Sequence, residues 1–194
     1  TDTSTDDQTT TEESEARSYI IPGTGQSACY DNNGIIECPS VDENFYGQDA
    51  QQSQALNYVD NGDGTITDLI TGLMWEKGFN ESLFNDAQST AANSTTANYT
   101  DWRVPTIKEL YSLIHFDGNQ GTGNPSSATP PSDAVPFIDT NYFDFEYPTD
   151  GRYIDAQYIS STEYVSTTMN GSATFFGVNF ADGRIKGYPI SGNV

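Results

Sequence analysis

Basic residues are scarce in this chain of 194 residues. Seven Lys or Arg face 28 Asp or Glu, which gives a formal net charge of -21. So negative a chain repels the phosphate backbone of nucleic acids and anionic membrane surfaces, and we expect no nucleic acid partner. The acidity is interpreted either as an aid to solubility in an extracellular or salty medium, or as a means of capturing divalent cations.

Catalytic groups are also scarce. His115 is the only histidine, which excludes a multi-histidine zinc site, and a serine triad would have to be built on this one residue without a nucleophile-elbow motif. The 28 carboxylates make some pair at glycosidase separation almost inevitable, so such a pair carries no signal. We predict no catalytic residue and a non-enzymatic function.

Long apolar runs are absent. No stretch reaches the roughly 18 apolar residues that span a bilayer, so we expect no direct membrane insertion. The chain begins without Met and without a signal peptide, as a mature exported protein or a trimmed segment would. We expect an extracellular or cell-surface location.

Cysteine occurs only at Cys29 and Cys38, on either side of an Asn33-Gly34 turn signal. This spacing suits a disulfide across a hairpin, which would contribute roughly 2 to 3 kcal/mol and would indicate an oxidising compartment. The alternative is a pair of free thiols. A metal site is disfavoured because no histidine lies nearby.

The composition divides the chain into three parts. Residues 1–17 are Thr, Ser, Asp and Glu without a large apolar side chain, which predicts a disordered acidic tail or linker. Residues 18–50 form an arm that carries the cysteine hairpin, and residues 51–194 form the main domain.

The main domain opens with a turn-rich, Asp-rich segment. Asn-Gly and Asp-Gly pairs between 58–59 and 65–67 predict a hairpin. The EF-hand pattern fails here, because each alignment of Gly62 or Gly64 with the invariant glycine places an apolar residue at a ligand position. An irregular calcium site that uses Asp60, Asp63 or Asp68 stays open, and Ca²⁺ is the one cofactor we consider.

Periodicity and capping residues predict helices at 83–92 and at 107–115. Thr106 would cap the second helix in a reciprocal capping box with Glu109. Its core face would carry Ile107, Leu110, Leu113 and Ile114.

Strands are expected at 153–159 and 174–180, with a turn leading into 184–188. The Gly-, Ser- and Pro-rich loop at 117–133 has the length of a ligand-binding loop, with candidate contacts from its polar side chains. These are Asp117, Asn119, Asn124 and Asp133.

Several blocks carry a resemblance to a known family: Thr-Gly-Leu-Met-Trp at 71–75, Asp-Trp-Arg-Val-Pro-Thr at 101–106, and Ser-Ser-Thr at 160–162. With the leader that begins at Thr24, they resemble the Lcl C-terminal domain family of bacterial secreted and surface proteins. The resemblance implies an α+β, C-type-lectin-like fold of short, mainly antiparallel strands with one or two helices. It also implies structural roles for Trp75 and Trp102 in the core and for Arg103 in an ion pair or as an anchor to a carbonyl group, and a turn at 160–164.

The chain also departs from the family pattern. It lacks the cysteine of the family's first helix and ends before the family's closing Val-Arg-Cys-Val-Arg strand, so we expect either a truncated chain or a sheet completed by another subunit. The member that names the family binds sulfated glycans, a ligand that a net charge of -21 should repel.

These observations predict a non-enzymatic adhesion or ligand-recognition module that binds a glycan or a surface protein, with calcium as a candidate aid. The alternative is a structural subunit of a surface filament or sheath that self-assembles when its arm adds a strand to a neighbour.

Overall fold

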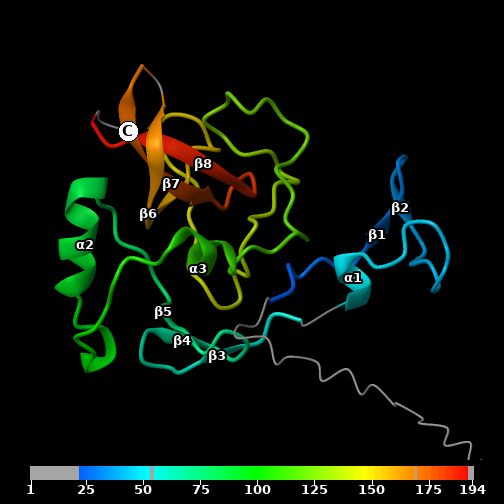
Figure 1. Ribbon diagram of the computed structural model, residues 1–194, viewed down its shortest axis with the longest axis horizontal. Coiled ribbons are helices and arrows are strands. Elements are labelled where there is room, and N and C mark those ends of the chain that lie inside the picture. Colours follow the sequence, from blue (N-terminus) through cyan, green and yellow to red (C-terminus); the bar gives the residue numbers. More distant parts are fainter. Residues whose placement is uncertain (1–21, 53–54, 169, 192–194) are drawn as a thin grey trace, which may run out of the picture.

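The computed structural model describes residues 22–52, 55–168 and 170–191. Within them the chain forms a small arm and a larger body, which lie side by side in Figure 1. The predicted acidic tail, residues 1–17, and the first residues of the predicted arm, 18–21, lie outside the described residues.

The arm is built around the predicted disulfide hairpin. Strands β1 (Cys29–Tyr30) and β2 (Ile35–Ile36) pair in antiparallel fashion. The disulfide joins Cys29 to Cys38, whose Cα atoms lie 5.1 Å apart. Asp31 holds the turn, because its carboxylate accepts hydrogen bonds from the backbone N–H groups of the Asn-Gly pair. The short helix α1 (Asp49–Gln52) completes the arm, and the predicted disulfide hairpin is confirmed.

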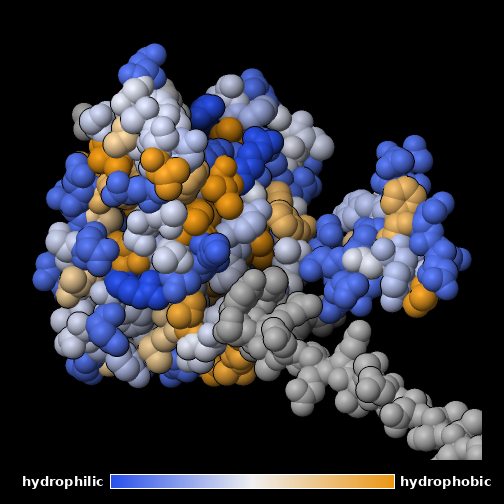
Figure 2. Space-filling model, in the orientation of Figure 1, coloured by the Kyte–Doolittle hydropathy of each residue, from blue (hydrophilic) through white to orange (hydrophobic). Residues whose placement is uncertain are grey.

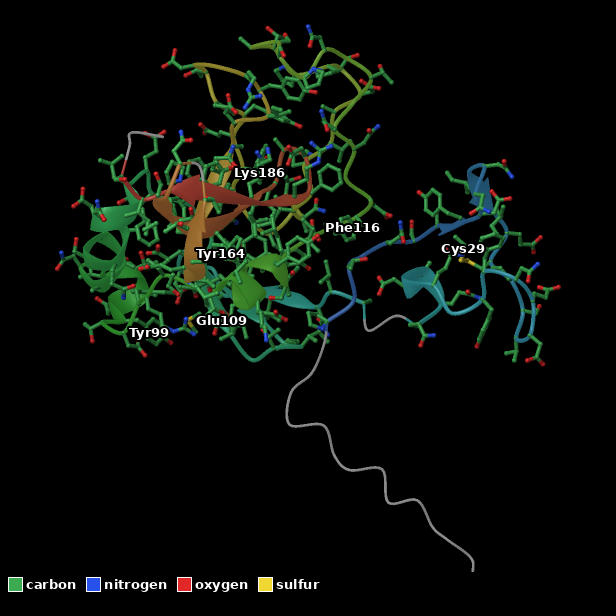
Figure 3. The ribbon with its side chains drawn as sticks, turned by 45° about the horizontal axis from the view of Figure 1, so that its top comes forward. Cys29, Tyr99, Glu109, Phe116, Tyr164 and Lys186 are labelled. Atoms are coloured by element: carbon green, nitrogen blue, oxygen red, sulfur yellow. A yellow bond between two sulfur atoms is a disulfide. The ribbon has the colours of Figure 1, made fainter. Side chains whose placement is uncertain are left out.

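The arm is attached to the body through residues near Thr24. The backbone N–H of Phe116 donates to the carbonyl oxygen of Thr24 over 2.7 Å. Ser27 donates its backbone N–H and its hydroxyl to Asp117 Oδ1 over 3.0 and 3.1 Å. Figure 3 labels Phe116 at the body end of this connection and Cys29 in the arm.

The first sheet of the body has the order β3 (Tyr58–Asp60), β4 (Thr65–Asp68), β5 (Met74–Glu76), all antiparallel. Gly62 and Gly64 have positive φ angles, 75° and 90°, in the turn between the first two strands. A side chain is strained in that region, so the Asn-Gly and Asp-Gly pairs place glycine where the turn requires it. The predicted hairpin is confirmed.

The second sheet has the order β6 (Gln157–Thr168), β7 (Ser172–Asn179), β8 (Arg184–Pro189), again antiparallel. The predicted strand at 174–180 and the turn into 184–188 correspond to β7 and β8. Both faces of β7 are covered, since its neighbouring residues Thr174 and Phe175 are both buried.

The turn predicted at 160–164 is wrong, because this segment lies inside β6. The β6–β7 register shifts between Ile159 and Glu163, so the strand bulges there instead of turning. The bulge aims its polar groups at the entry to helix α3: the N–H of Ser161 donates to the Pro105 carbonyl over 2.8 Å, and Thr162 Oγ1 accepts from the N–H of Ile107 over 2.9 Å.

The body's helices are α2 (Phe84–Ala92), the 3₁₀ turn η1 (Thr96–Asn98) and α3 (Ile107–Tyr111). The capping box of Thr106 and Glu109 is present as predicted. Helix α3 ends at residue 111, earlier than the predicted 115. No helix in the described segments is both long and apolar enough to cross a membrane.

The core lies around α3, between the two three-stranded sheets (Figure 1). Its buried side chains come from β3 and β4, from α3 and the turn after it, from the segment 138–143, and from β7 and the residue after it. They are Tyr58, Ile66, Leu110, Leu113, Ile114, Ile138, Phe143, Val178 and Phe180. Three antiparallel sheets of short strands and few helices, in the part of the chain that the structure describes, make this an α+β fold, as predicted.

Candidate functional site

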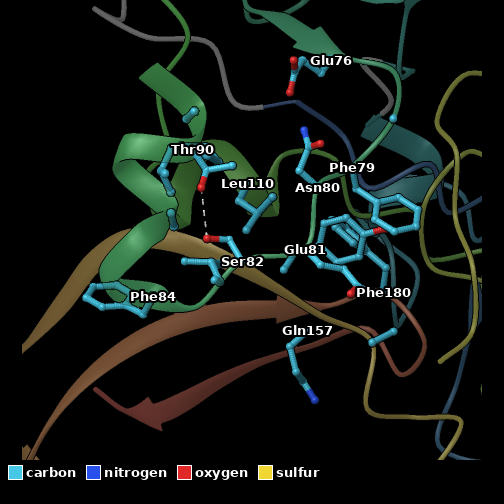
Figure 4. Close-up of a pocket in the computed structure, with 18 of the residues that line it drawn as sticks. Glu76, Phe79, Asn80, Glu81, Ser82, Phe84, Thr90, Leu110, Gln157 and Phe180 are labelled. Carbon is cyan, nitrogen blue, oxygen red and sulfur yellow. Dashed lines mark hydrogen bonds between the residues drawn. The ribbon is translucent and has the colours of Figure 1, made fainter. Parts of the chain in front are cut away.

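A groove of about 1380 Å³ runs along the body. Its walls come from β5, from α2 and the segment 78–83 that leads into it, from 99–105, from 143–149 and from strands β6 to β8. Figure 4 shows Phe79, Glu81 and Ser82 of the linking segment, with Phe84 and Thr90 of α2 beside them. The groove is therefore assembled from segments more than 100 residues apart, and its size exceeds that of a typical small-molecule pocket.

Aromatic rings line the groove in contacting pairs. Phe84 of α2 stacks on Phe175 of β7 with ring centroids 4.3 Å apart. Phe79 meets Tyr158 edge to face at 6.0 Å, and Phe79 remains 40% exposed. Tyr99 meets the edge of Trp102 at 6.1 Å. The exposed parts of these rings offer apolar contact area along the groove.

The groove's cations are each held by a carboxylate of the protein itself. Lys77 Nζ lies 2.7 Å from Asp60 Oδ2, and Arg152 Nη2 lies 2.6 Å from Asp155 Oδ1. Arg103 donates two parallel hydrogen bonds to the carboxylate of Glu109, over 2.8 and 2.6 Å. A ligand that needs a free cation would have to break one of these pairs first.

The fourth cation pair is the most deeply placed. Lys186 is labelled in Figure 3, and its Nζ atom lies 2.6 Å from Asp182 Oδ2. The side chain of Asp182 is completely buried. Arg184 Nη1 approaches the same oxygen at 3.6 Å. Both cations stand on β8, two residues apart and hence on one face of the strand. If Lys186 were absent, the charge of the buried Asp182 carboxylate would be poorly compensated.

Other carboxylates of the groove have no such partner. The carboxylates of Glu81, Asp101, Asp144 and Glu146 accept no hydrogen bond and form no ion pair with the described residues. The charge of Asp144 does act on Lys77, because it adds to the larger effect of Asp60 in raising the pKa of that ammonium group. Burial raises the pKa of the Tyr158 phenol, and the charges of Asp144 and Glu146 raise this pKa further. These two carboxylates therefore share one neighbourhood with the Tyr158 ring.

The carboxyl groups that show pKa shifts in the groove are stable anions. The guanidinium of Arg103, aided by the N–H and hydroxyl of Thr106, lowers the pKa of Glu109 to about 2. Arg152 likewise lowers the pKa of Asp155. General acids need a pKa raised toward the working pH, so neither group is suited to donate a proton.

The predicted calcium ligands do not converge. Asp60 is paired with Lys77, while Asp63 Oδ1 accepts from the N–H and hydroxyl of Thr65 over 3.1 and 2.6 Å. Asp68 is buried, and its two oxygens accept from the segment that follows it, including the Thr71 hydroxyl at 2.6 Å. The described residues contain no group of three or more His, Cys, Asp or Glu that could hold a metal. The three Asp hold turns through these hydrogen bonds, and calcium binding stays a prediction.

The four predicted loop contacts use their side-chain oxygens within the protein. Asp117 accepts from Ser27, Asn119 from the N–H of Gly121, Asn124 from the N–H of Ser126, and Asp133 from the N–H of Thr122. The last bond lowers the pKa of Asp133. These residues shape the loop and its contact with the arm, and the loop lies outside the groove.

Two of the three residues given structural roles keep them, whereas Trp102, predicted to lie in the core, is outside the core cluster. Trp75 is half-buried and packs against the core, although its indole N–H has no acceptor among the described residues. Trp102 is half-buried at the groove wall, where Nε1 donates to the Thr96 carbonyl over 3.2 Å. Arg103 forms the predicted ion pair.

Sequence reasoning missed the residues that give the groove its chemistry, among them Phe79, Asp144, Glu146 and Tyr158. For Asp144, Glu146 and Tyr158 the only signal was a density of carboxylates and aromatic residues between 142 and 158, and that pattern does not indicate which side chains point outward. The single histidine, His115, contacts the arm, where its ring lies against Gly25.

Comparison with known proteins found one family. A sequence model described as the Lcl C-terminal domain matches residues 64–194. No curated protein and no solved structure matches the chain.

Proposed function

The chain belongs to the Lcl C-terminal domain family, and from this premise we propose that it is a non-enzymatic recognition module that binds a glycan or a protein in the groove of the body. One observation carries the proposal: a groove of about 1380 Å³ whose walls combine exposed aromatic rings with unpaired carboxylates. Aromatic area supplies contact energy, and the few polar groups supply orientation.

The electrostatics of the groove support binding without catalysis. The shifted carboxyl groups there hold lowered pKa values, and the cations are engaged in ion pairs. Such groups persist unchanged across neutral pH, which suits a contact surface more than proton transfer. A location outside the cytosol is part of the proposal, and the Cys29–Cys38 disulfide supports it because cytosolic thiols are kept reduced.

The test is a glycan and protein-ligand screen of two matched variants. Ala91 lines the groove, whereas Ala92, the next residue of α2, is exposed and does not line it. Ala91→Trp should fill part of the groove and weaken binding of any hit by about tenfold or more, while Ala92→Trp should leave it unchanged. Equal binding by both variants would show that the groove is not the site. Repeating the screen with a chelator tests the calcium prediction.

A second candidate function is a filament or sheath subunit, and one feature of the arm favours it. The arm exposes large apolar side chains on a surface that Figure 2 shows among hydrophilic neighbours. They are Tyr30, Ile35, Val41, Phe45 and Tyr46, with Ile35 72% and Val41 64% exposed. A disulfide-locked element with this much exposed apolar area suits a protein contact.

This second candidate predicts ordered polymers that depend on the arm. Ile35→Ser together with Val41→Ser should reduce the assembled fraction in size-exclusion chromatography and electron microscopy. Val165→Ser is the matched control, because Val165 is 98% exposed on β6 of the body. A monomer for the unaltered chain at all concentrations would argue against the structural role and leave the recognition role standing.

A further inference from the structure

The free charges of the groove have one sign. Its cations, Lys77, Arg103, Arg152 and Lys186, are each paired with a carboxylate within 2.7 Å. The charged groups that lack an ion-pair partner among the described residues are the carboxylates introduced above, of which Asp144 also attracts the Lys77 ammonium that Asp60 holds. An anionic ligand would meet repulsion there, and a neutral ligand would dehydrate these carboxylates without compensating their charge. Charge complementarity therefore favours a cationic ligand.

Two of these carboxylates form a defined subsite with two aromatic rings. Asp144 and Glu146 are exposed, whereas the alternate residues Phe143 and Phe145 turn toward the core. The N–H of Asp144 donates to the Lys77 carbonyl over 2.9 Å, which holds this segment beside Phe79. The same segment and Phe79 also border a smaller hollow of about 470 Å³.

The aromatic part of the subsite is the pair Phe79 and Tyr158. The two rings meet edge to face, at an interplanar angle of 65°, so Phe79 keeps exposed ring area. A cation over an aromatic face gains about 0.5 to 1 kcal/mol at an exposed site. Carboxylates next to the ring add a longer-range attraction for the same cation.

We propose that the subsite of Phe79, Asp144, Glu146 and Tyr158 binds the ammonium or guanidinium group of a Lys or Arg side chain, and that the groove takes an extended basic segment of a protein partner. This inference rests on the proposed function and names the ligand class of the same site.

A basic peptide fits the subsite better than an amino-sugar polymer does. The ammonium of Lys ends a flexible stem of methylenes, so the stem can cover Phe79 while the charge reaches between Asp144 and Glu146. Sugar rings need broad aromatic faces, yet Tyr99 and Trp102 meet at an interplanar angle of 82° and Phe79 and Tyr158 at 65°. In each pair one ring is turned edge-on to the other, so the two rings do not form one broad face for a sugar ring.

The probe is a hexalysine peptide, titrated calorimetrically into the full chain at low salt and at about 150 mM salt, where the Debye length is about 8 Å. Asp144→Asn with Glu146→Gln removes the subsite charges. Glu37→Gln with Asp42→Asn, on the arm, removes the same charge at exposed positions far from the groove. At the higher salt, the double substitution in the subsite should weaken hexalysine binding by about tenfold. The double substitution in the arm should weaken it by less than about twofold.

A second pair of variants tests the ring without changing charge. Phe79→Leu should weaken hexalysine binding by about two- to fivefold. Phe45→Leu, at an arm phenylalanine that is 44% exposed, should leave binding unchanged. Circular dichroism of every variant verifies that its fold is retained.

The possible outcomes separate this inference from the proposed function. Equal weakening by the subsite and arm pairs would mean that hexalysine responds to the overall charge, and this inference would be overturned. Binding of a glucosamine hexamer that depends on Asp144 and Glu146, without such binding of hexalysine, would replace the protein segment by an amino-sugar ligand and leave the groove as the site. If the Ala91→Trp variant also changed no interaction found in the screens, the proposed function itself would fail.

Discussion

The hydroxyl of Tyr58 lies inside the core without a hydrogen-bond partner among the described residues. Burial, and then the charges of Asp68 and Asp139, raise the pKa of this phenol. A buried hydroxyl that has lost its water contacts costs about 1 to 3 kcal/mol. Tyr58→Phe should therefore leave the free energy of unfolding unchanged or raise it by about 1 kcal/mol, as measured by urea denaturation.

Tyr153 provides the control at the same scale. It is also buried, but its hydroxyl donates to the Gln120 carbonyl over 3.1 Å. Tyr153→Phe should lower the free energy of unfolding by about 1 kcal/mol, because the carbonyl loses its donor. Equal effects of the two substitutions would contradict the assignment of the unpaired hydroxyl to Tyr58.

Glu109 connects the ion pair with Arg103 to the cap of α3. Its pKa falls from 4.5 to about 2 on folding, so the stability it contributes is present above pH 4.5 and is lost as the pH falls toward 2. The Arg103 side chain is 51% exposed, so solvent screens the pair, and we expect Glu109→Gln to cost about 1 to 2 kcal/mol at pH 7.

The pH dependence distinguishes this origin from a loss of packing. The difference in free energy of unfolding between Glu109→Gln and the unaltered chain should shrink between pH 4.5 and 2. Thermal unfolding followed at several pH values measures it. A difference that stays constant down to pH 2 would assign the effect to packing.

Local signals predicted the elements that depend on neighbouring residues. Thr106 and Glu109 are three residues apart, so their capping box is visible in the sequence and present in the structure. The bulge at 160–162 depends instead on Pro105 and Ile107, more than 50 residues away, which bind its backbone and hydroxyl. The turn was expected from the resemblance of a short block of sequence, which cannot reveal such partners, and it was wrong for that reason.

The disulfide hairpin is an element whose stability can be tested by itself. Cys29 and Cys38 are nine residues apart, and closing such a loop contributes about 2 to 3 kcal/mol. Because the arm's contacts with the body involve Thr24 and Ser27, outside the hairpin, reduction should loosen β1 and β2 without unfolding the body. Hydrogen exchange should accelerate in residues 29–38 and stay constant in β7. Global unfolding on reduction would contradict this division.

At the scale of the whole molecule, the groove illustrates what the sequence could not provide. Its acidity follows from the net charge of -21, but the pairing of its cations depends on contacts such as Lys77 with Asp60 and Lys186 with Asp182. The pair of Lys77 and Asp60 joins the residue after β5 to strand β3, so it can form only once the sheet has formed. Composition therefore predicted the sign of the surface, and the fold determines where unpaired charge remains.

The connection between arm and body depends on a glycine. Gly25 has a φ of 69°, and a Cβ atom there would lie 2.8 Å from Cδ2 of His115, closer than side chains pack. Gly25→Ala should therefore shift the His115 ring or detach the arm, and hydrogen exchange of the Phe116 N–H, which donates to Thr24, should rise by about tenfold or more. Gly171→Ala is the matched control, since its φ of 89° imposes similar backbone strain but no atom lies within 4 Å of the added carbon. If the two substitutions changed Phe116 exchange equally, backbone strain would account for the effect and the His115 contact would not hold the arm in place.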